Sequence, residues 1–163
     1  MAKIPLTKRK FKGQYVIVDD SDFEILSQWN WCEDKDGYVI RTGRKSDGVY
    51  MHRLIRMHRQ ILNALDSSLE VDHINHNVKD NRKSNLRLCK RKQNMENSRI
   101  SKHSTSGYKG VYWHRAISKW CAQITIDGRC MHLGLFLVKK QAALAYNEAA
   151  KQYFGEFACL NVL

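Results

Sequence analysis

Three polar positions near the middle of the chain have side chains suited to act together. Asp72 stands directly before His73, and Asn94 follows within the same basic stretch. The carboxylate and the amide offer hard oxygen ligands, and the imidazole can accept a proton near neutral pH. Between Lys79 and Lys102, nine Lys or Arg residues stand against two acids. A carboxylate, a base and a neutral oxygen ligand in a cationic field suit hydrolysis of a phosphodiester in a polyanion.

The surrounding sequence predicts a strand, a polar loop, a second strand and a helix. Their ranges are 69–74, 75–84, 87–89 and 90–98. Because neighbouring strand residues point to opposite faces, Asp72 can bind metal while His73 faces the attacking water, or the reverse. We expect Asn77, Asn81 and Asn85 to tie the loop to the backbone through side-chain hydrogen bonds.

The same stretch resembles the core of HNH endonucleases, in particular the group carried by phages and mobile introns. That group has Asp-His, a loop with Asp-Asn, then Asn-Leu-Arg, and a helix with a final Asn or His. The matching residues are Asp72-His73, Asp80-Asn81, Asn85-Leu86-Arg87 and Asn94. The alternative for the same residues is an ordinary polar turn followed by a basic helix.

The resemblance implies a ββα-metal fold and a metal-dependent DNA endonuclease. It assigns to His73 the role of the base that activates water, and to Asn85 the role of orienting the histidine segment. It makes Asp72 and Asn94 the ligands of one divalent cation. With oxygen ligands only, Mg²⁺ is the expected ion and Mn²⁺ the alternative. Products would carry a 5′ phosphate and a 3′ hydroxyl.

Composition is consistent with this chemistry. The 163 residues carry a formal net charge of +12, with a pI near 9.6, which indicates a polyanionic partner. No apolar run approaches the ~20 residues of a membrane span, and no signal-peptide pattern opens the chain, so we expect no membrane partner. The five cysteines are scattered without a Cys-x-x-Cys pair. We therefore expect no disulfide framework, no structural zinc and a reducing cytoplasm, in a bacterial or phage-infected cell.

Residues 1–50 carry nine basic and eight acidic residues, so this part is the least suited to gripping DNA. Its pattern predicts short strands and one short helix, with a strand at Tyr15–Val18 and a hairpin turn at Asp36-Gly37. We expect Trp29 and Trp31 to fill a small core rather than to stack on bases. A basic cluster contacts phosphates or is simply solvated, and comprises Lys8, Arg9, Lys10 and Lys12.

Residues 50–65 show helical periodicity in their apolar positions, which predicts a helix. His52 and His58 lie within it. Neither has a third partner at a suitable spacing for a metal site, so we expect packing or hydrogen-bonding roles for both.

The last sixty residues predict a three-stranded antiparallel sheet packed on one helix. The strands are expected at 109–114, 120–126 and 130–136, and the helix at 139–154. Asp127-Gly128 suits a tight hairpin between the last two strands. Alternation places Trp120 and Ile124 toward the helix. It also turns three residues of the last strand inward, which are Met131, Leu133 and Leu135. The helix has a face of small and aromatic residues, namely Ala142, Ala145, Tyr146, Ala149, Ala150 and Tyr153.

These residues resemble an APETALA2/ethylene-response-factor-type DNA-binding domain over 107–161. The resemblance is carried by Tyr108–Val111, Lys119–Ile124, Leu133–Phe136, Ala142–Ala150 and Leu160-Asn161. That family lays its sheet in the major groove. Its base-reading positions fall here on Lys109, Tyr112, His114, Gln123, Thr125, Cys130 and His132. Plant members have Arg or Trp at many of these positions, so their target sequence does not carry over to this chain.

Further basic residues are expected on DNA. Arg115, Lys119 and Arg129 are assigned to phosphates, which position a protein without specifying sequence. Arg87 and Lys92, in the nuclease core, are also assigned to DNA. Residues 97–107 read as a linker, either a basic arm along a DNA groove or a flexible tether.

Together these patterns predict an α+β protein in four parts: a β-rich region at 1–50, a nuclease core at 51–98, a linker at 99–107 and a DNA-binding domain at 108–163. The expected function is site-directed cleavage of double-stranded DNA by a monomer or weak dimer. One alternative is a non-catalytic, sequence-specific DNA-binding regulator with a degenerate nuclease core. An RNA-binding protein is a further alternative, and it draws only on the charge.

Overall fold

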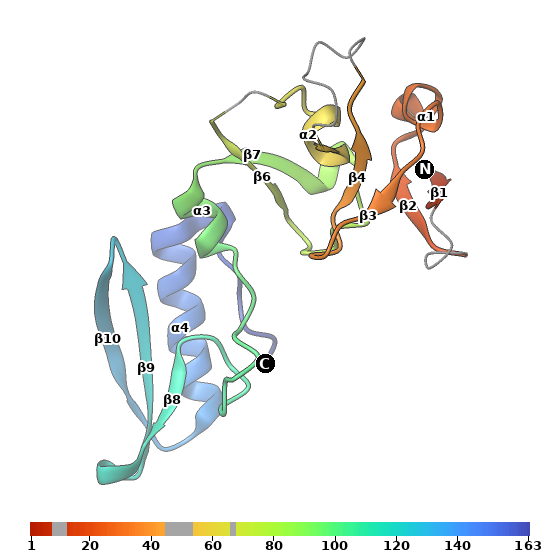
Figure 1. The fold of residues 1–163 in the computed structure, drawn as a ribbon. Helices are drawn as coiled ribbons and strands as arrows, with labels where there is room; N and C mark the ends of the chain where they lie inside the picture. Colours follow the sequence, from red (N-terminus) through yellow and green to blue (C-terminus); the bar gives the residue numbers. More distant parts are fainter. Residues whose placement is uncertain (8–12, 45–53, 66–67) are drawn as a thin grey trace. The chain divides into compact units, whose positions relative to one another are not determined.

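The computed structural model describes residues 1–7, 13–44, 54–65 and 68–163. It is a mixed α+β protein built from small antiparallel sheets, which confirms the predicted fold class (Figure 1). The chain forms two compact units, Met1–Arg91 and Lys92–Leu163. The N-terminal basic cluster, and positions 50–53 with His52, lie outside the described residues. Within the described ranges, no helix combines the length and apolar character that a membrane span requires.

The first unit opens with a hairpin and a short helix. Strand β1 (Ala2–Pro5) pairs antiparallel with β2 (Tyr15–Val18), and α1 (Asp20–Ser27) follows. The core beneath them includes Trp31, which is fully buried and donates its indole N–H to the Leu26 carbonyl at 2.8 Å. Trp29 packs partly buried against the same cluster, so the pair fills a core as predicted.

A three-stranded sheet follows, in the order β3 (Cys32–Glu33), β4 (Val39–Thr42) and β5 (Leu54–Arg56). Gly37 has φ +86° in the predicted turn between β3 and β4. The helix predicted over 50–65 is wrong in its described part: 54–56 is strand β5, and helix α2 covers only Met57–Ile61. Pairing of Ile55 with Arg41 on β4 buries the Ile55 side chain, and this tertiary contact overrides the local helical period.

The predicted strand, loop, strand and helix around the histidine are present. Strand β6 (Glu70–His73) pairs antiparallel with β7 (Leu86–Cys89), and a 3₁₀ turn, η3 (Lys83–Asn85), immediately precedes β7. Helix α3 (Arg91–Glu96) follows β7. The register places Asp72 opposite Arg87, and this pairing determines much of the site described below.

In the second unit, three strands form a sheet in the order β10-β9-β8, with α4 (Lys139–Phe154) along one face (Figure 1). The strands are β8 (Val111–His114), β9 (Lys119–Ile126) and β10 (Arg129–Phe136), with 3₁₀ turns η4 (Arg115–Ile117) after β8 and η5 (Gly155–Phe157) after α4. Asp127 and Gly128 both have positive φ in the predicted hairpin turn.

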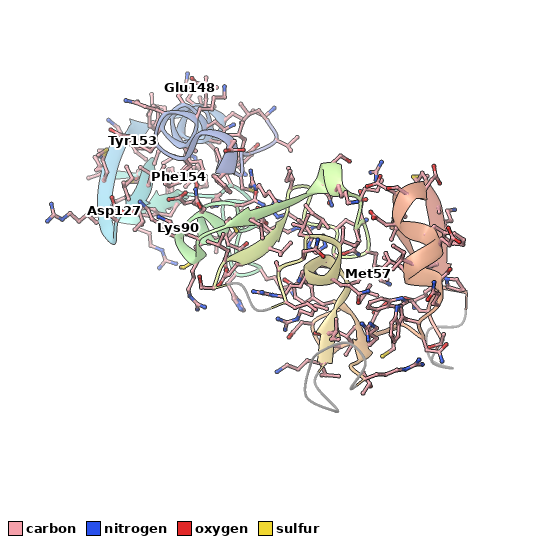
Figure 2. All side chains as sticks on the ribbon, turned by 90° about the horizontal axis from the view of Figure 1, so that it is seen from above. Met57, Lys90, Asp127, Glu148, Tyr153 and Phe154 are labelled. Atoms are coloured by element: carbon pink, nitrogen blue, oxygen red, sulfur yellow. The ribbon has the colours of Figure 1, made fainter. Side chains whose placement is uncertain are left out.

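Three side-chain placements in this unit differ from expectation. Met131, which was expected to face inward, is 40% exposed. A bulge between His132 and Gly134 shifts the register of β10, so Leu135 pairs with Cys121 on the outer face and is 42% exposed. The inward prediction for Leu135 is therefore wrong, and Phe136 packs inward in its place. On α4, Tyr153 is exposed, and Phe154 packs against the sheet. Glu148 is exposed and lies on the side of α4 opposite Phe154 (Figure 2).

Candidate active site

Asp72 and His73 are consecutive on β6 and both are 5% exposed, yet they contact different partners. The Arg87 guanidinium donates to Oδ2 of Asp72 from Nε at 2.9 Å and from Nη2 at 2.8 Å. The two residues face each other across the β6–β7 ladder, so the register itself forms this buried ion pair. The opposite pointing of adjacent strand residues, expected from the sequence, is what separates the surroundings of Asp72 from those of His73.

His73 lies in a small aromatic cluster. Its ring is edge-on to His58, with centroids 5.1 Å apart, and tilted against Tyr38 at 6.1 Å. Burial lowers the pKa of His73, although the Asn81 hydrogen bond and the carboxylates of Asp72 and Asp80 oppose this shift. The imidazole is therefore neutral at neutral pH, the state in which it can accept a proton.

His58 is 4% exposed. Burial, followed by the charges of His73, Arg56 and Arg59, lowers its pKa to about 3. It is a neutral packing neighbour of His73, which agrees with the packing role expected for it. Its position beside His73 could not be predicted, because it depends on the strand pairing of β5.

The loop between β6 and β7 is held by asparagine side chains, as predicted. Asn85 accepts from the backbone N–H of Asn75 at 2.9 Å and donates to the Asp80 carbonyl at 2.7 Å. Asn77 accepts from the backbone N–H of Lys79 at 3.1 Å. Asn81 is fully buried, donates to the Val78 carbonyl at 3.1 Å, and places Oδ1 3.3 Å from Nε2 of His73.

The contact between Asn81 and His73 was not predicted. The sequence assigned Asn81 only to loop structure, although Asp80-Asn81 belongs to the matched pattern and was the signal that could have indicated it. Beside it, Asp80 accepts two hydrogen bonds from Arg82, both at 2.7 Å. These bonds are the main cause of the lowered pKa of Asp80. The loop is therefore ordered by buried polar contacts on both sides of Asn81.

The expected metal ligands are a carboxylate and an amide. Asp72 belongs to the first unit, and Asn94 lies on α3 within the second. Among the described residues, no group of three or more His, Cys, Asp or Glu side chains is arranged to hold a metal ion. A set of two oxygen donors still fits Mg²⁺, which keeps several of its own waters. Arg87 donates two hydrogen bonds to Oδ2 of Asp72.

The expected DNA-contacting residues lie mostly on the sheet of the second unit. On its outer face, Tyr112, Thr125 and His132 are exposed, and Gln123 and His114 are partly so. The expected phosphate contacts are all exposed, and these are Arg115, Lys119 and Arg129. Cys130 pairs with Thr125, and His132 with Gln123, so these side chains share one face.

Three other residues assigned to DNA have protein partners. The Lys109 ammonium donates to the carbonyls of Glu96 at 2.8 Å and Ser98 at 2.7 Å, and burial lowers its pKa. Lys92 pairs with Asp127 at 2.5 Å. Arg87 pairs with Asp72, as described above. Sequence alone could not place these cations, since each partner is distant in the chain or set by strand register.

Comparison with known proteins identifies relatives of this chain. A family model described as HNH endonuclease matches residues 49–96. A protein named as an HNH endonuclease, from Acanthamoeba polyphaga mimivirus, is 33% identical over 154 residues, covering 92% of this chain and 76% of the relative. Protein 3.8 of Escherichia phage T7 is 32% identical over 78 residues, covering 45% of this chain and 64% of the relative. No solved structure matches the chain significantly.

Proposed function

This chain belongs to the HNH endonuclease family, and we propose that it is a metal-dependent DNA endonuclease whose general base is His73. The observation that carries the proposal is the placement of His73 on β6. It is a buried imidazole with a lowered pKa, directly after the carboxylate of Asp72. A histidine that is neutral at neutral pH can remove the proton from an attacking water.

We assign Asp72 and Asn94 as the ligands of one divalent cation, Mg²⁺ or alternatively Mn²⁺. HNH nucleases generally use a divalent metal. When bound, such a cation supplies stabilisation of negative charge on the scissile phosphate and on the leaving 3′ oxygen. Arg87 orients the carboxylate of Asp72, because two guanidinium N–H groups hold one of its oxygens.

Asn85 is assigned to orient the histidine segment. Asn85 joins the first residues of the loop to its end, so it limits how far β6 and its histidine can move. His73 receives the proton of the attacking water, and the products carry a 5′ phosphate and a 3′ hydroxyl. One nuclease core per chain favours a nick in a single strand, made by a monomer.

We propose that the second unit binds DNA in the manner of the APETALA2-type domain that it resembles. Its support is a three-stranded sheet with a helix on one face and polar side chains on the other. Gln123, Thr125 and His132 would meet base edges, and Arg129 a phosphate. Lys109 is not part of the proposed interface, because its ammonium already serves two carbonyl groups.

Supercoiled plasmid DNA tests the activity. With Mg²⁺ we expect conversion to the nicked form, with 5′ phosphate and 3′ hydroxyl at the break, and no conversion in excess chelator. Cleavage that persists in chelator, or the opposite end chemistry, would contradict the mechanism.

The specific observation that favours a non-catalytic DNA-binding regulator is the buried ion pair that occupies Oδ2 of Asp72. The same plasmid assay separates the two functions. A regulator would retard DNA in a gel yet leave it intact with either Mg²⁺ or Mn²⁺.

A further inference from the structure

We propose that Asn81 is a positioning residue for His73. Its side-chain oxygen holds the imidazole proton on Nε2, so that Nδ1 is the nitrogen that receives the proton of the attacking water. The catalytic part of this inference rests on the proposed function, whereas the protonation pattern of the ring can be measured without any activity. Asn81 itself touches neither water nor phosphate in this assignment and acts only through the histidine.

The hydrogen-bond partners of Asn81 determine which end of its amide faces the histidine. The side-chain nitrogen lies 3.1 Å from the Val78 carbonyl oxygen, which can only accept. That nitrogen is therefore the donor, and Oδ1 is the atom 3.3 Å from Nε2 of His73. An amide oxygen also only accepts. The hydrogen bond consequently requires a proton on Nε2, and the lone pair of the neutral ring is on Nδ1.

Burial makes this arrangement persistent. Asn81 is 0% exposed, so water cannot replace either of its side-chain partners without opening the loop. The ring of His73 is also confined laterally by the edge-on ring of His58. An imidazole rotated by half a turn would place a ring carbon against Oδ1 and lose the hydrogen bond.

The N-terminal hairpin holds Asn81 from the other side. The backbone N–H of Asn81 donates to the Ile17 carbonyl at 2.8 Å, and the N–H of Ile17 donates to the Lys79 carbonyl at 2.8 Å. Ile17 and Asp80 thus form a parallel bridge, and the loop extends the β1–β2 hairpin by one short segment. The N-terminal region, which has little net charge, therefore stabilises the loop that positions His73.

Side-chain contacts reinforce this bridge on both flanks of the loop. The Lys79 ammonium contacts Gln14 at 2.5 Å and Glu33 at 2.6 Å. The backbone N–H of Lys83 donates to Asp19 at 2.8 Å. These polar contacts join segments that are far apart in the sequence, so the N-terminal part of the first unit contributes to the placement of Asn81.

The experiment uses nitrogen-15 NMR of the imidazole rings in the full chain, with Asn81→Leu and Asn81→Asp as variants. In the wild type at pH 7.5 we expect His73 as the Nε2–H tautomer. Asn81→Leu removes the acceptor at similar volume, so we expect mixed tautomers. It should also lower the cleavage rate constant by about 100-fold, within the range for general-base catalysis, and leave DNA affinity within about twofold. Asn81→Asp keeps an acceptor and should recover the Nε2–H tautomer and part of the rate.

The matched control is Asn77→Ala, which removes another asparagine side chain from the same loop and should leave the tautomer unchanged. A wild-type spectrum with the proton on Nδ1 would overturn the proposal, even if the Asn81 variants did not fold. So would an Asn81→Leu protein that keeps the pure tautomer and the full rate. If the wild type shows the expected tautomer but cleaves no DNA, the proposed function fails and the assignment of the ring proton stands.

Discussion

At the scale of single residues, the site depends on which side chains the neighbouring residues Asp72 and His73 each contact. Asp72 takes the guanidinium of Arg87, and His73 takes the amide of Asn81, although the two are adjacent in sequence. Adjacent strand residues point to opposite faces, and the β6–β7 register places Arg87 opposite Asp72.

The buried histidine His58 makes the stability of the fold depend on pH. Its pKa is about 3 in the folded protein and 6.5 in the unfolded chain. Between these values the unfolded chain binds more protons, so the free energy of unfolding decreases as pH falls. We expect a loss of up to about 1.4 kcal/mol per pH unit below pH 6.5. His58 therefore contributes its full stabilisation above pH 6.5.

Urea unfolding of the wild type and of His58→Phe, measured from pH 7.5 to 4, tests this dependence. The phenylalanine keeps an aromatic ring beside His73 and cannot titrate, so the slope should become clearly shallower. The control is His103→Gln, a change at an exposed histidine, which should leave the slope as in the wild type. Equal slopes for wild type and His58→Phe would refute the assignment.

At the scale of elements, one glycine decides how closely the sheet and helix of the second unit approach. Gly110 has φ +73°, and a Cβ built there would lie 2.1 Å from the ring of Tyr146 and 2.5 Å from the Gln123 carbonyl. Gly128, in the β9–β10 turn, has φ +76° and nothing within 4 Å of such a Cβ. The two positions share a left-handed backbone and differ in the space around them.

Alanine at these two glycines separates backbone strain from steric conflict. Gly128→Ala should cost about 1 kcal/mol, the penalty of a left-handed residue. Gly110→Ala should cost about 3 kcal/mol, because overpacking adds to the same strain. Thermal or urea unfolding measures both. Equal losses would mean that the contact with Tyr146 relaxes freely.

The elements also show where local sequence stops being informative. The strand-loop-strand-helix order around His73 and the sheet-plus-helix order after Gly107 follow from hydrophobic period and turn residues. Strand β5 could not be predicted from these signals, because Ile55 is buried by pairing with β4. The local hydrophobic period of this segment is equally compatible with a helix. The predicted orientation of Leu135 is wrong for a related reason, because a single bulge reverses which residues of β10 face inward.

The candidate site was predictable in its residue types and not in its partners. Asp72, His73 and the loop asparagines were evident from spacing. The contacts of Arg87, Lys109 and Asn81 come from tertiary structure, so sequence assigned the first two to DNA and missed the link from the third to His73.

At the scale of the whole molecule, the charge of +12 indicates that DNA binding weakens steeply with salt. The charge is unequal along the chain, since residues 51–163 carry nineteen basic and eight acidic residues. Ile17 and Glu33 are among the described N-terminal residues that hold the loop beside His73, and the near-neutral composition of residues 1–50 suits a structural role.

Arg129 offers a test of the proposed DNA interface. If it contacts a phosphate, Arg129→Ala should weaken binding to all sequences alike and reduce the slope of log affinity against log salt by about 1. The control is Lys151→Ala on α4, where the lysine pairs with Glu148 at 3.0 Å and should leave the slope unchanged. The measurement is fluorescence anisotropy of labelled duplex DNA from low to moderate salt. Identical slopes for Arg129→Ala and wild type would exclude the phosphate contact.

The role of His73 as general base is tested most directly by comparing cleavage and binding in His73→Ala. With Mg²⁺ and saturating enzyme on supercoiled plasmid, we expect the rate constant for nicking to fall by about 10²–10⁴-fold. The affinity for the same DNA should stay within about twofold of the wild type, because the His73 side chain is buried and the proposed DNA-binding residues belong to the second unit. Wild-type nicking by His73→Ala, or equal loss of cleavage and binding, would contradict the account.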